Sequence, residues 1–372
     1  MPRQANAVDF WRGFALVTIF INHIPGIFYE RLTHRNFSIS DSADLFVFLA
    51  GWSLRLLAGN PGRASAAYLV VRLGGRALQI YAAQILILAV AIAMLAAAAV
   101  LLQNPLILEW HNAAAVFFDP VPAHLGMVML SHHLGYFDIL PLYVVLMLMA
   151  PAIALIDRYT PRLLLPLSLA VYFGALAFQI TLPSWPVQGE WFFNPFAWQL
   201  VFVLGFVLAR GDAASPGLGG FARRHMRWLR LASVPIVVGS ALIIWNDWWP
   251  DPTKMPHPVL LFIQSKSYAT PMRLIQFLAL MALFSATYPL IWRLAPGVVR
   301  FLSLLGRNSL EVFCVGSLLS LAGQIVRFIY QGGIVIDTAV VTVGLALLAL
   351  TAWLTEWRER NRAPRTAATA SA

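Results

Sequence analysis

Long apolar runs, separated by short polar segments, follow one another along almost the whole chain. A run of about 17 to 25 apolar residues is long enough to cross a bilayer as a helix. Such runs fall near 10–29, 42–58, 77–102, 138–156, 163–181, 196–210, 229–245, 270–290, 309–330 and 334–354. The third extends back to Tyr68 if it forms one long helix, and the run at 196–210 is short. The pattern predicts an all-α, polytopic integral membrane protein with about ten transmembrane helices.

Composition indicates the same class. Of the 372 residues, 60% are hydrophobic and 11% are charged, whereas a soluble domain is about half apolar and about a quarter charged. The formal charge of +10 would suit nucleic acid, but the basic residues are scattered and form no clustered stripe. We therefore expect no nucleic-acid partner. Cys314 is the only cysteine, which excludes an intramolecular disulfide and a cysteine-based zinc cluster.

The distribution of charge across the ten predicted spans sets the orientation. With the N-terminus in the cytoplasm, the outer segments hold only six of the 26 basic residues, namely Arg31, Arg35, Lys254, Lys266, Arg273 and Arg327. The positive-inside rule predicts this asymmetry, so both termini are expected in the cytoplasm. We expect a single transmembrane domain at 1–357, a large outer loop at 103–137 within it, and a disordered cytoplasmic tail at 358–372. The loop is longer than a plain connection needs, which favours a lid or a binding surface.

The first predicted span carries two ionisable residues, Arg12 and His23. Eleven residues at roughly 100° each return almost to the starting direction, so the two side chains share a helix face, about 16 Å apart along the axis. An ionisable group inside a membrane is costly and is a functional candidate. His23 can act as a general base, because the pKa of imidazole lies near neutrality. The alternative is a neutral histidine that bonds to a neighbouring helix.

Acidic residues stand at the predicted outer starts of two spans. The stretch NFSISDSADLFVFLAGWS places Asp41 and Asp44 after a loop short enough to keep them near His23. A carboxylate there can orient the imidazole and stabilise its charged form. The alternative is helix capping, because an acidic side chain at a helix N-terminus satisfies free amides. Asp138 starts the fourth span, where it is a candidate for substrate binding or for capping.

Other side chains near the predicted outer face are candidates for substrate binding. Tyr143 follows closely in DILPLY, and FNPFAWQ supplies Asn194, Trp198 and Gln199. These groups can hydrogen-bond or stack on a sugar or an acyl group, although an Asn-Pro step is also an ordinary helix start.

Five blocks of sequence carry a resemblance to a known family. They are DFWRGFALVTIFINHIPG, NFSISDSADLFVFLAGWS, YFDILPLYVVLMLMAP, FNPFAWQLVFVLGFVLA and LGRNSLEVFCVGSLLS, in order along nearly the whole chain. In these blocks the chain resembles the glucan succinyltransferase (OpgC) family, which is similar to the broader acyltransferase family 3 of membrane O-acyltransferases. The resemblance implies a multi-pass enzyme of the bacterial inner membrane. It would transfer an acyl group, typically succinyl, from cytoplasmic acyl-CoA to hydroxyls of a periplasmic glucan.

The resemblance also implies roles for particular residues. In the broader family the arginine and histidine of the first helix are the functional pair, and these match Arg12 and His23. We expect His23 to deprotonate the acceptor hydroxyl while Asp44 or Asp41 orients it. Acyl-CoA would be the donor substrate, no bound cofactor or metal is expected, and the remaining partners would be the lipid bilayer and a glycan.

Four further basic residues have expected roles in this scheme. Arg72 and Arg76 would join Arg12 in holding the phosphates of coenzyme A, since guanidinium pairs well with phosphate oxygens. The alternative is that Arg72 and Arg76 only set topology. Lys266 and Arg273 lie on the predicted outer side as candidates for substrate binding, and Arg273 could meet a succinyl carboxylate. A rival reading of the chain is a proton-coupled transporter of a small molecule or glycan precursor, in which intramembrane histidine and carboxylates relay protons.

Overall fold

The computed structural model describes residues 6–59, 65–211 and 217–362, and these are almost entirely helical. The strands among them are β1 (Pro183–Ser184) and β2 (Gly189–Glu190), a short antiparallel pair. The predicted all-α class is therefore confirmed. The chain divides into two compact units, one made of Met1–Tyr29 with Pro289–Ala372 and the other of Glu30–Tyr288.

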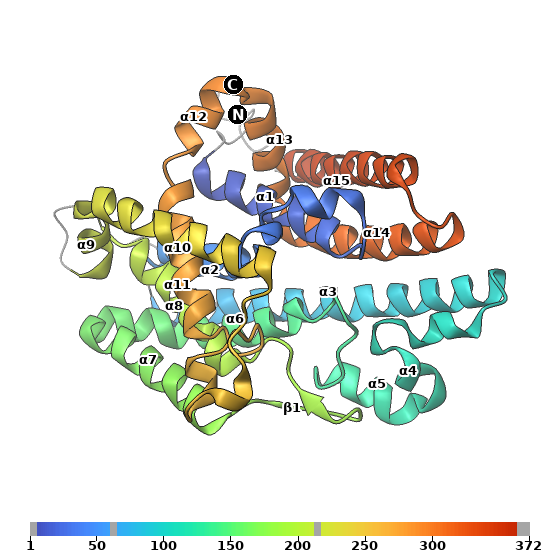
Figure 1. Cartoon of the computed structure of the whole chain (residues 1–372), viewed down its shortest axis with the longest axis horizontal. Helices are drawn as coiled ribbons and strands as arrows, with labels where there is room; N and C mark the ends of the chain where they lie inside the picture. The colour runs from blue at the N-terminus through green and yellow to red at the C-terminus, as the bar shows by residue number, and fades with distance from the viewer. Residues whose placement is uncertain (1–5, 60–64, 212–216, 363–372) are drawn as a thin grey trace, which may run out of the picture. The chain divides into compact units, whose positions relative to one another are not determined.

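The first unit joins the N-terminal helix to the C-terminal helices. It contains α1 (Ala7–Asn22), α13 (Pro296–Arg307), α14 (Ser309–Ile329) and α15 (Ile334–Arg362), with α12 (Tyr288–Leu294) at its boundary. Figure 1 shows α14 and α15 as a long helical hairpin. α1 packs mainly along α13 and also along α14.

Glycines allow the backbones of α1 and α13 to touch. A Cβ atom added to Gly13 would lie 1.9 Å from the carbonyl oxygen of Leu302, and one added to Gly306 would lie 1.8 Å from that of Asp9. Neither position has space for a side chain, so this pair of glycines fixes where the two helices cross.

The second unit is larger. Its α-helices are α2 (Ser42–Ala58), α3 (Ala66–Leu101), α4 (Ala114–Phe118), α5 (Pro120–Val128), α6 (Ile139–Tyr159), α7 (Pro161–Phe178), α8 (Pro195–Leu208), α9 (Leu218–Arg224), α10 (Met226–Asn246) and α11 (Pro271–Phe284). Short 3-10 helices are η1 (Phe28–Leu32), which begins before the unit boundary, η2 (His34–Asn36), η4 (Pro105–Asn112), η5 (Pro252–Lys254) and η6 (Val259–Leu261). α2 packs on α8, α3 on α6, α7 on α8, and α10 on α11.

Each of the ten predicted spans coincides with a helix, but the number of membrane spans is not confirmed. Six helices are long and apolar enough to cross a membrane, namely α3, α6, α7, α10, α14 and α15; a seventh is reached if the broken pair α11 and α12 counts as one span. α1 and α2 have 16 and 17 residues, and α8 is a shorter apolar helix of 14. Ten spans, and the side on which the termini lie, remain predictions.

The structure adds detail to two other expectations. The segment 103–137 contains η4, α4 and α5, and its place as a large outer loop stays a prediction. The predicted tail at 358–372 starts inside a helix, since α15 continues to Arg362; the rest of the tail lies outside the described residues. The single domain predicted at 1–357 stays a prediction.

Candidate functional site

α1 holds the pair Arg12 and His23 in the first unit. The helix starts at an Asn6 cap, whose side chain accepts a hydrogen bond of 2.9 Å from the amide of Asp9. Arg12 lies in the second turn and is half-buried. His23 is the C-cap residue, and its amide donates to the carbonyl of Ile19 at 3.0 Å. The helix therefore ends at the imidazole, which is also half-buried, with its Nδ1 atom enclosed by the protein.

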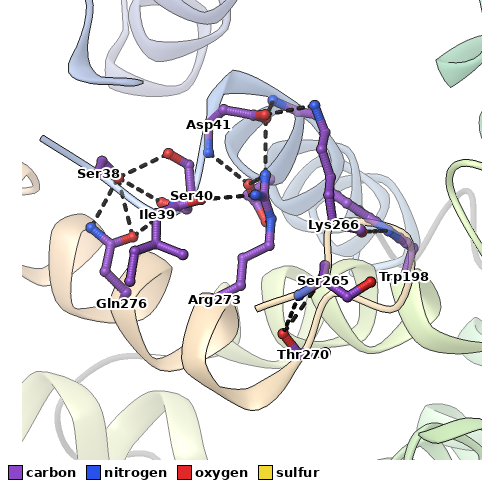
Figure 2. Close-up of polar contacts among 12 residues, drawn as sticks. Ser38, Ile39, Ser40, Asp41, Trp198, Ser265, Lys266, Thr270, Arg273 and Gln276 are labelled. Carbon is purple, nitrogen blue, oxygen red and sulfur yellow. Dashed lines mark hydrogen bonds and ion pairs between the residues drawn. The ribbon is translucent and has the colours of Figure 1, made fainter. Parts of the chain in front are cut away.

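A cluster of opposite charges forms a separate candidate site within the second unit. We call Asp41, Asp44, Lys266 and Arg273 the charge cluster (Figure 2). Asp41 and Asp44 come together because they form a capping box at the start of α2. The Asp41 carboxylate accepts from the amide of Ala43 at 2.9 Å, and the Asp44 carboxylate accepts from the amide of Asp41 at 2.9 Å.

Arg273 is the centre of the charge cluster. Its side chain comes from the first turn of α11 and is 2% exposed. Nε and Nη2 donate to the two oxygens of Asp44 at 3.0 and 2.5 Å, Nη1 donates to the carbonyl of Ile39 at 2.8 Å, and Nη2 also lies 3.1 Å from Asp41. The two-pronged contact with Asp44 is the strong geometry for a guanidinium and a carboxylate. Every nitrogen of Arg273 is thus directed at a protein oxygen.

Lys266 is the accessible cation of the charge cluster. Its ammonium lies 2.6 Å from Asp41, and its side chain is 29% exposed. The same ammonium sits 5.3 Å from the ring centres of Phe192 and of Phe193, a distance at which cation–π attraction acts. Lys266 thus has a charged partner on one side and aromatic faces on another.

The charge cluster shifts the titration of the carboxyl groups around it. Burial by itself would raise the pKa of Asp41, but the positive charges of Lys266 and Arg273 outweigh it and hold that pKa well below its usual range. Asp138 behaves in the opposite way, because burial raises its pKa to about 6 although the charge of Lys266 works against this. The pKa of Asp138 thus lies closer to neutral pH than that of an ordinary carboxyl group.

Sequence reasoning missed the hydrogen bonds that hold the segment before α2. The side-chain oxygen of Gln276 accepts from the hydroxyl of Ser38 at 3.1 Å and from the amide of Ser40 at 3.0 Å (Figure 2). Gln276 follows Arg273 by three residues on α11, so both side chains lie on one helix face. That spacing, together with the hydroxyl-rich NFSIS, was the available signal. Buried His34 was also missed; burial lowers its pKa, although nearby Asp41 acts to raise it.

Capping, the alternative reading of Asp41 and Asp44, is what the structure shows for both residues. Asp44 also has Arg273 as its cationic partner. His23 belongs to the first unit and Asp44 to the second, and the pairing of these two side chains stays a prediction. Asp138 is the opposite case, because its side chain makes no capping hydrogen bond at the start of α6.

Three predicted substrate contacts are occupied by the protein itself. Tyr143 donates to the carbonyl of Phe46 at 2.6 Å. Asn194 caps α8 and donates to the carbonyl of Ile180 at 2.7 Å, and Gln199 bonds to Ser168 through both ends of its amide, at 2.7 and 2.9 Å.

Trp198 is likewise enclosed. Its indole is fully buried and donates to the carbonyl of Lys266 at 3.0 Å, while the guanidinium of Arg273 lies 5.9 Å from its ring centre. Trp198 thus contacts two members of the charge cluster, and the roles of these four side chains in substrate binding stay predictions.

The arginines predicted to hold coenzyme A belong to different units of the chain. Arg72 and Arg76 are on α3 of the second unit, and Arg12 is on α1 of the first. Arg72 donates to Tyr68, one turn earlier, and Arg76 donates to Gln79 at 2.7 Å. The acceptors of these two hydrogen bonds are local and neutral.

The histidines of segment 103–137 sit in aromatic surroundings. The ring centroids of His133 and Trp191 lie 4.7 Å apart, and those of His111 and Tyr136 lie 5.3 Å apart. Burial lowers the pKa of His133 to about 4 and also lowers that of His132. Within residues 6–59, 65–211 and 217–362, the structure has no group of three His, Cys, Asp or Glu side chains that could hold a metal ion.

Comparison with known proteins gives one match. The model of a protein family described as "OpgC protein" matches residues 3–360. Neither a curated protein nor a solved structure gave a significant match.

Proposed function

Because the chain belongs to the OpgC protein family, we propose that it is a multi-pass O-acyltransferase of the bacterial inner membrane. In this proposal it transfers a succinyl or similar acyl group from cytoplasmic acyl-CoA to hydroxyls of a periplasmic glucan. The observation that carries the proposal is the family match over nearly the whole chain. Support also comes from the apolar helices of a membrane protein and from α1, which holds the arginine and the histidine that the reaction needs.

The chemistry assigned to His23 is general base catalysis. The imidazole removes the proton of a sugar hydroxyl while the hydroxyl oxygen attacks the thioester carbonyl. The new C–O ester bond forms, the C–S bond breaks, and the imidazolium returns its proton to the departing thiolate. The step requires only a base, a positioned hydroxyl and a site poor in water.

Arg12 is proposed to contact the donor, with Arg72 and Arg76 as further contacts for the phosphates of coenzyme A. A guanidinium forms paired, charge-assisted hydrogen bonds to phosphate oxygens. Arg72 and Arg76 donate to the neutral side chains of Tyr68 and Gln79, and a phosphate would replace these neutral acceptors with charged oxygens.

In this proposal, Lys266 and not Arg273 contacts the terminal carboxylate of a dicarboxylic acyl group. Freeing Arg273 would leave Asp44 buried without its cation, which costs about 3–5 kcal/mol. Lys266 is 29% exposed, has one carboxylate within its reach in the charge cluster, and carries three donors. The faces of Phe192 and Phe193 beside it suit the methylene carbons of such an acyl group. Asp138, with its raised pKa and uncapped side chain, is proposed as a hydrogen-bonding group in the same place.

Purified variants incubated with succinyl-CoA and glucan test the proposal, with the ester product measured by mass spectrometry. We expect His23→Ala to abolish transfer and Arg12→Ala to raise the KM for acyl-CoA. His225→Ala is the control, because His225 is exposed and bonds only locally, to the carbonyl of Phe221. Full ester formation by His23→Ala would refute the assigned mechanism.

The transporter reading predicts proton movement through His23, Asp44 and Asp138 without consumption of acyl-CoA. The pairing of Asp44 favours the enzyme, because both of its oxygens accept from Arg273. A mobile proton on Asp44 would have to displace a buried guanidinium.

A further inference from the structure

The turn that follows α1 is held by side chains from the far end of the sequence. α1 ends at Asn22, and the chain then turns through His23, Pro25 and Gly26 before η1 begins at Phe28. We propose that Gln324, Arg327 and Asp337, here named the turn clamp, are positioning residues that set the place of the His23 imidazole. This inference rests on the proposed function, in which His23 is the base.

One face of α14 receives the carbonyl groups of the turn. Gln324 donates from Nε2 to the carbonyl of His23 at 2.6 Å. Arg327 donates from Nη1 to the carbonyl of Pro25 and from Nη2 to that of Gly26 at 2.7 Å. Because Gln324 and Arg327 are three residues apart on a helix, their side chains point the same way. Three carbonyls of the turn are therefore bound by one rigid helix.

The amide of Phe28, at which η1 begins, is bound by a side chain of α15. The two carboxylate oxygens of Asp337 accept hydrogen bonds from different donors. Oδ1 accepts from Nε of Arg327 at 2.6 Å, and Oδ2 accepts from the amide of Phe28 at 2.7 Å. The side chain of Asp337 is 3% exposed. Asp337 thus holds Arg327 in place and closes the turn at its other end.

This arrangement exceeds what the end of a helix needs. The last carbonyls of a helix lack internal partners and can be satisfied by water or by any nearby donor. Here the backbone from 23 to 28 is bound at four points by three side chains of α14 and α15, two of them charged. The backbone of His23 is thereby fixed on both sides, and a fixed backbone restricts where the imidazole can lie. Reaction rates depend steeply on such placement, and a shift of about 1 Å can cost about 100-fold.

Kinetics of clamp variants test the proposal. We expect Gln324→Leu, Arg327→Gln and Asp337→Asn each to lower kcat by roughly 10- to 100-fold, with unchanged KM for acyl-CoA and for glucan. Arg327→Lys should fall between wild type and Arg327→Gln, because lysine keeps the charge but not the forked donors that reach two carbonyls. An unchanged kcat, or a loss confined to KM, would overturn the clamp.

A matched ion pair in the same unit supplies the control. Arg307 donates from Nε to Glu356 at 2.8 Å, with side chains 17% and 21% exposed. Arg307 ends α13, and Glu356 lies near the end of α15 that is opposite to the clamp. Arg307→Gln and Glu356→Gln should lower thermal stability as the clamp variants do while leaving kcat unchanged. An equal fall of kcat in the clamp variants and in the Arg307 and Glu356 variants would show that the clamp has only a structural role.

The His23→Ala background separates this inference from the proposed function. If His23→Ala is inactive while the clamp variants turn over normally, the clamp fails and the assigned base stands. If His23→Ala is fully active, the assigned mechanism itself fails.

Discussion

The buried contact between Arg273 and Asp44 should contribute strongly to the stability of the second unit. The two side chains are 2% and 1% exposed and share two hydrogen bonds, at 3.0 and 2.5 Å. Removing one member of a buried ion pair costs about 3–5 kcal/mol, because the other charge stays buried without its partner. We expect Asp44→Asn and Arg273→Met each to lower the free energy of unfolding by about that amount.

Denaturant unfolding in detergent micelles gives the free energy of unfolding of both single variants and of their double mutant. Since the two residues contact each other, the double mutant should lose less stability than the sum of the losses in the two single variants. Arg35 and Glu30 give the control in the same unit, because they form an ion pair of 2.9 Å with side chains 54% and 29% exposed. Arg35→Gln should cost less than about 1 kcal/mol, as exposed pairs do.

Additive losses at Arg273 and Asp44, or a loss no larger than that at Arg35, would refute the reasoning. The same variants examine the predicted role of Asp44 beside His23. If Asp44 orients the imidazole, Asp44→Asn lowers kcat per folded molecule more than Arg273→Met does. Equal kcat in the two variants would limit Asp44 to its part in the charge cluster.

Three further outcomes are expected. Lys266→Gln should reduce succinyl transfer more than acetyl transfer, since only succinyl has a second carboxylate, while Lys254→Gln, at an exposed lysine, should reduce neither; equal loss of both transfers would count against the contact. The pKa of Asp138 rises from 3.8 to about 6 on folding, so its contribution to stability is complete below pH 3.8 and disappears as pH rises through 6. The free energy of unfolding of Asp138→Asn, measured across this pH range, should lack this dependence. Gly51→Val should prevent the packing of α2 on α8, because a Cβ there would lie 1.8 Å from the carbonyl oxygen of Phe202; wild-type thermal stability would contradict this contact.

The helices could be predicted from the sequence because their signal is local. Each of the ten apolar runs coincides with a helix, and the long alternative for the third run is the one observed, as α3 begins at Ala66. The amphipathic α13 was not predicted, since its polar face breaks the apolar run on which the search depended. The family was also predictable, because its five blocks are contiguous stretches that need no knowledge of contacts.

The partners within the site could not be predicted, because they are not local. Asp44 and Arg273 are 229 residues apart in sequence, and Gln324 is 301 residues from the carbonyl it binds. Composition and topology identify which charges are costly in a membrane protein, but they do not say which opposite charge neutralises each one. Arg273 illustrates the consequence. As an isolated cation among acidic outer segments it resembles a ligand contact, yet its buried guanidinium is already satisfied by Asp44, Asp41 and the carbonyl of Ile39. A cation free to exchange partners must keep access to solvent, and in the charge cluster that property belongs to Lys266.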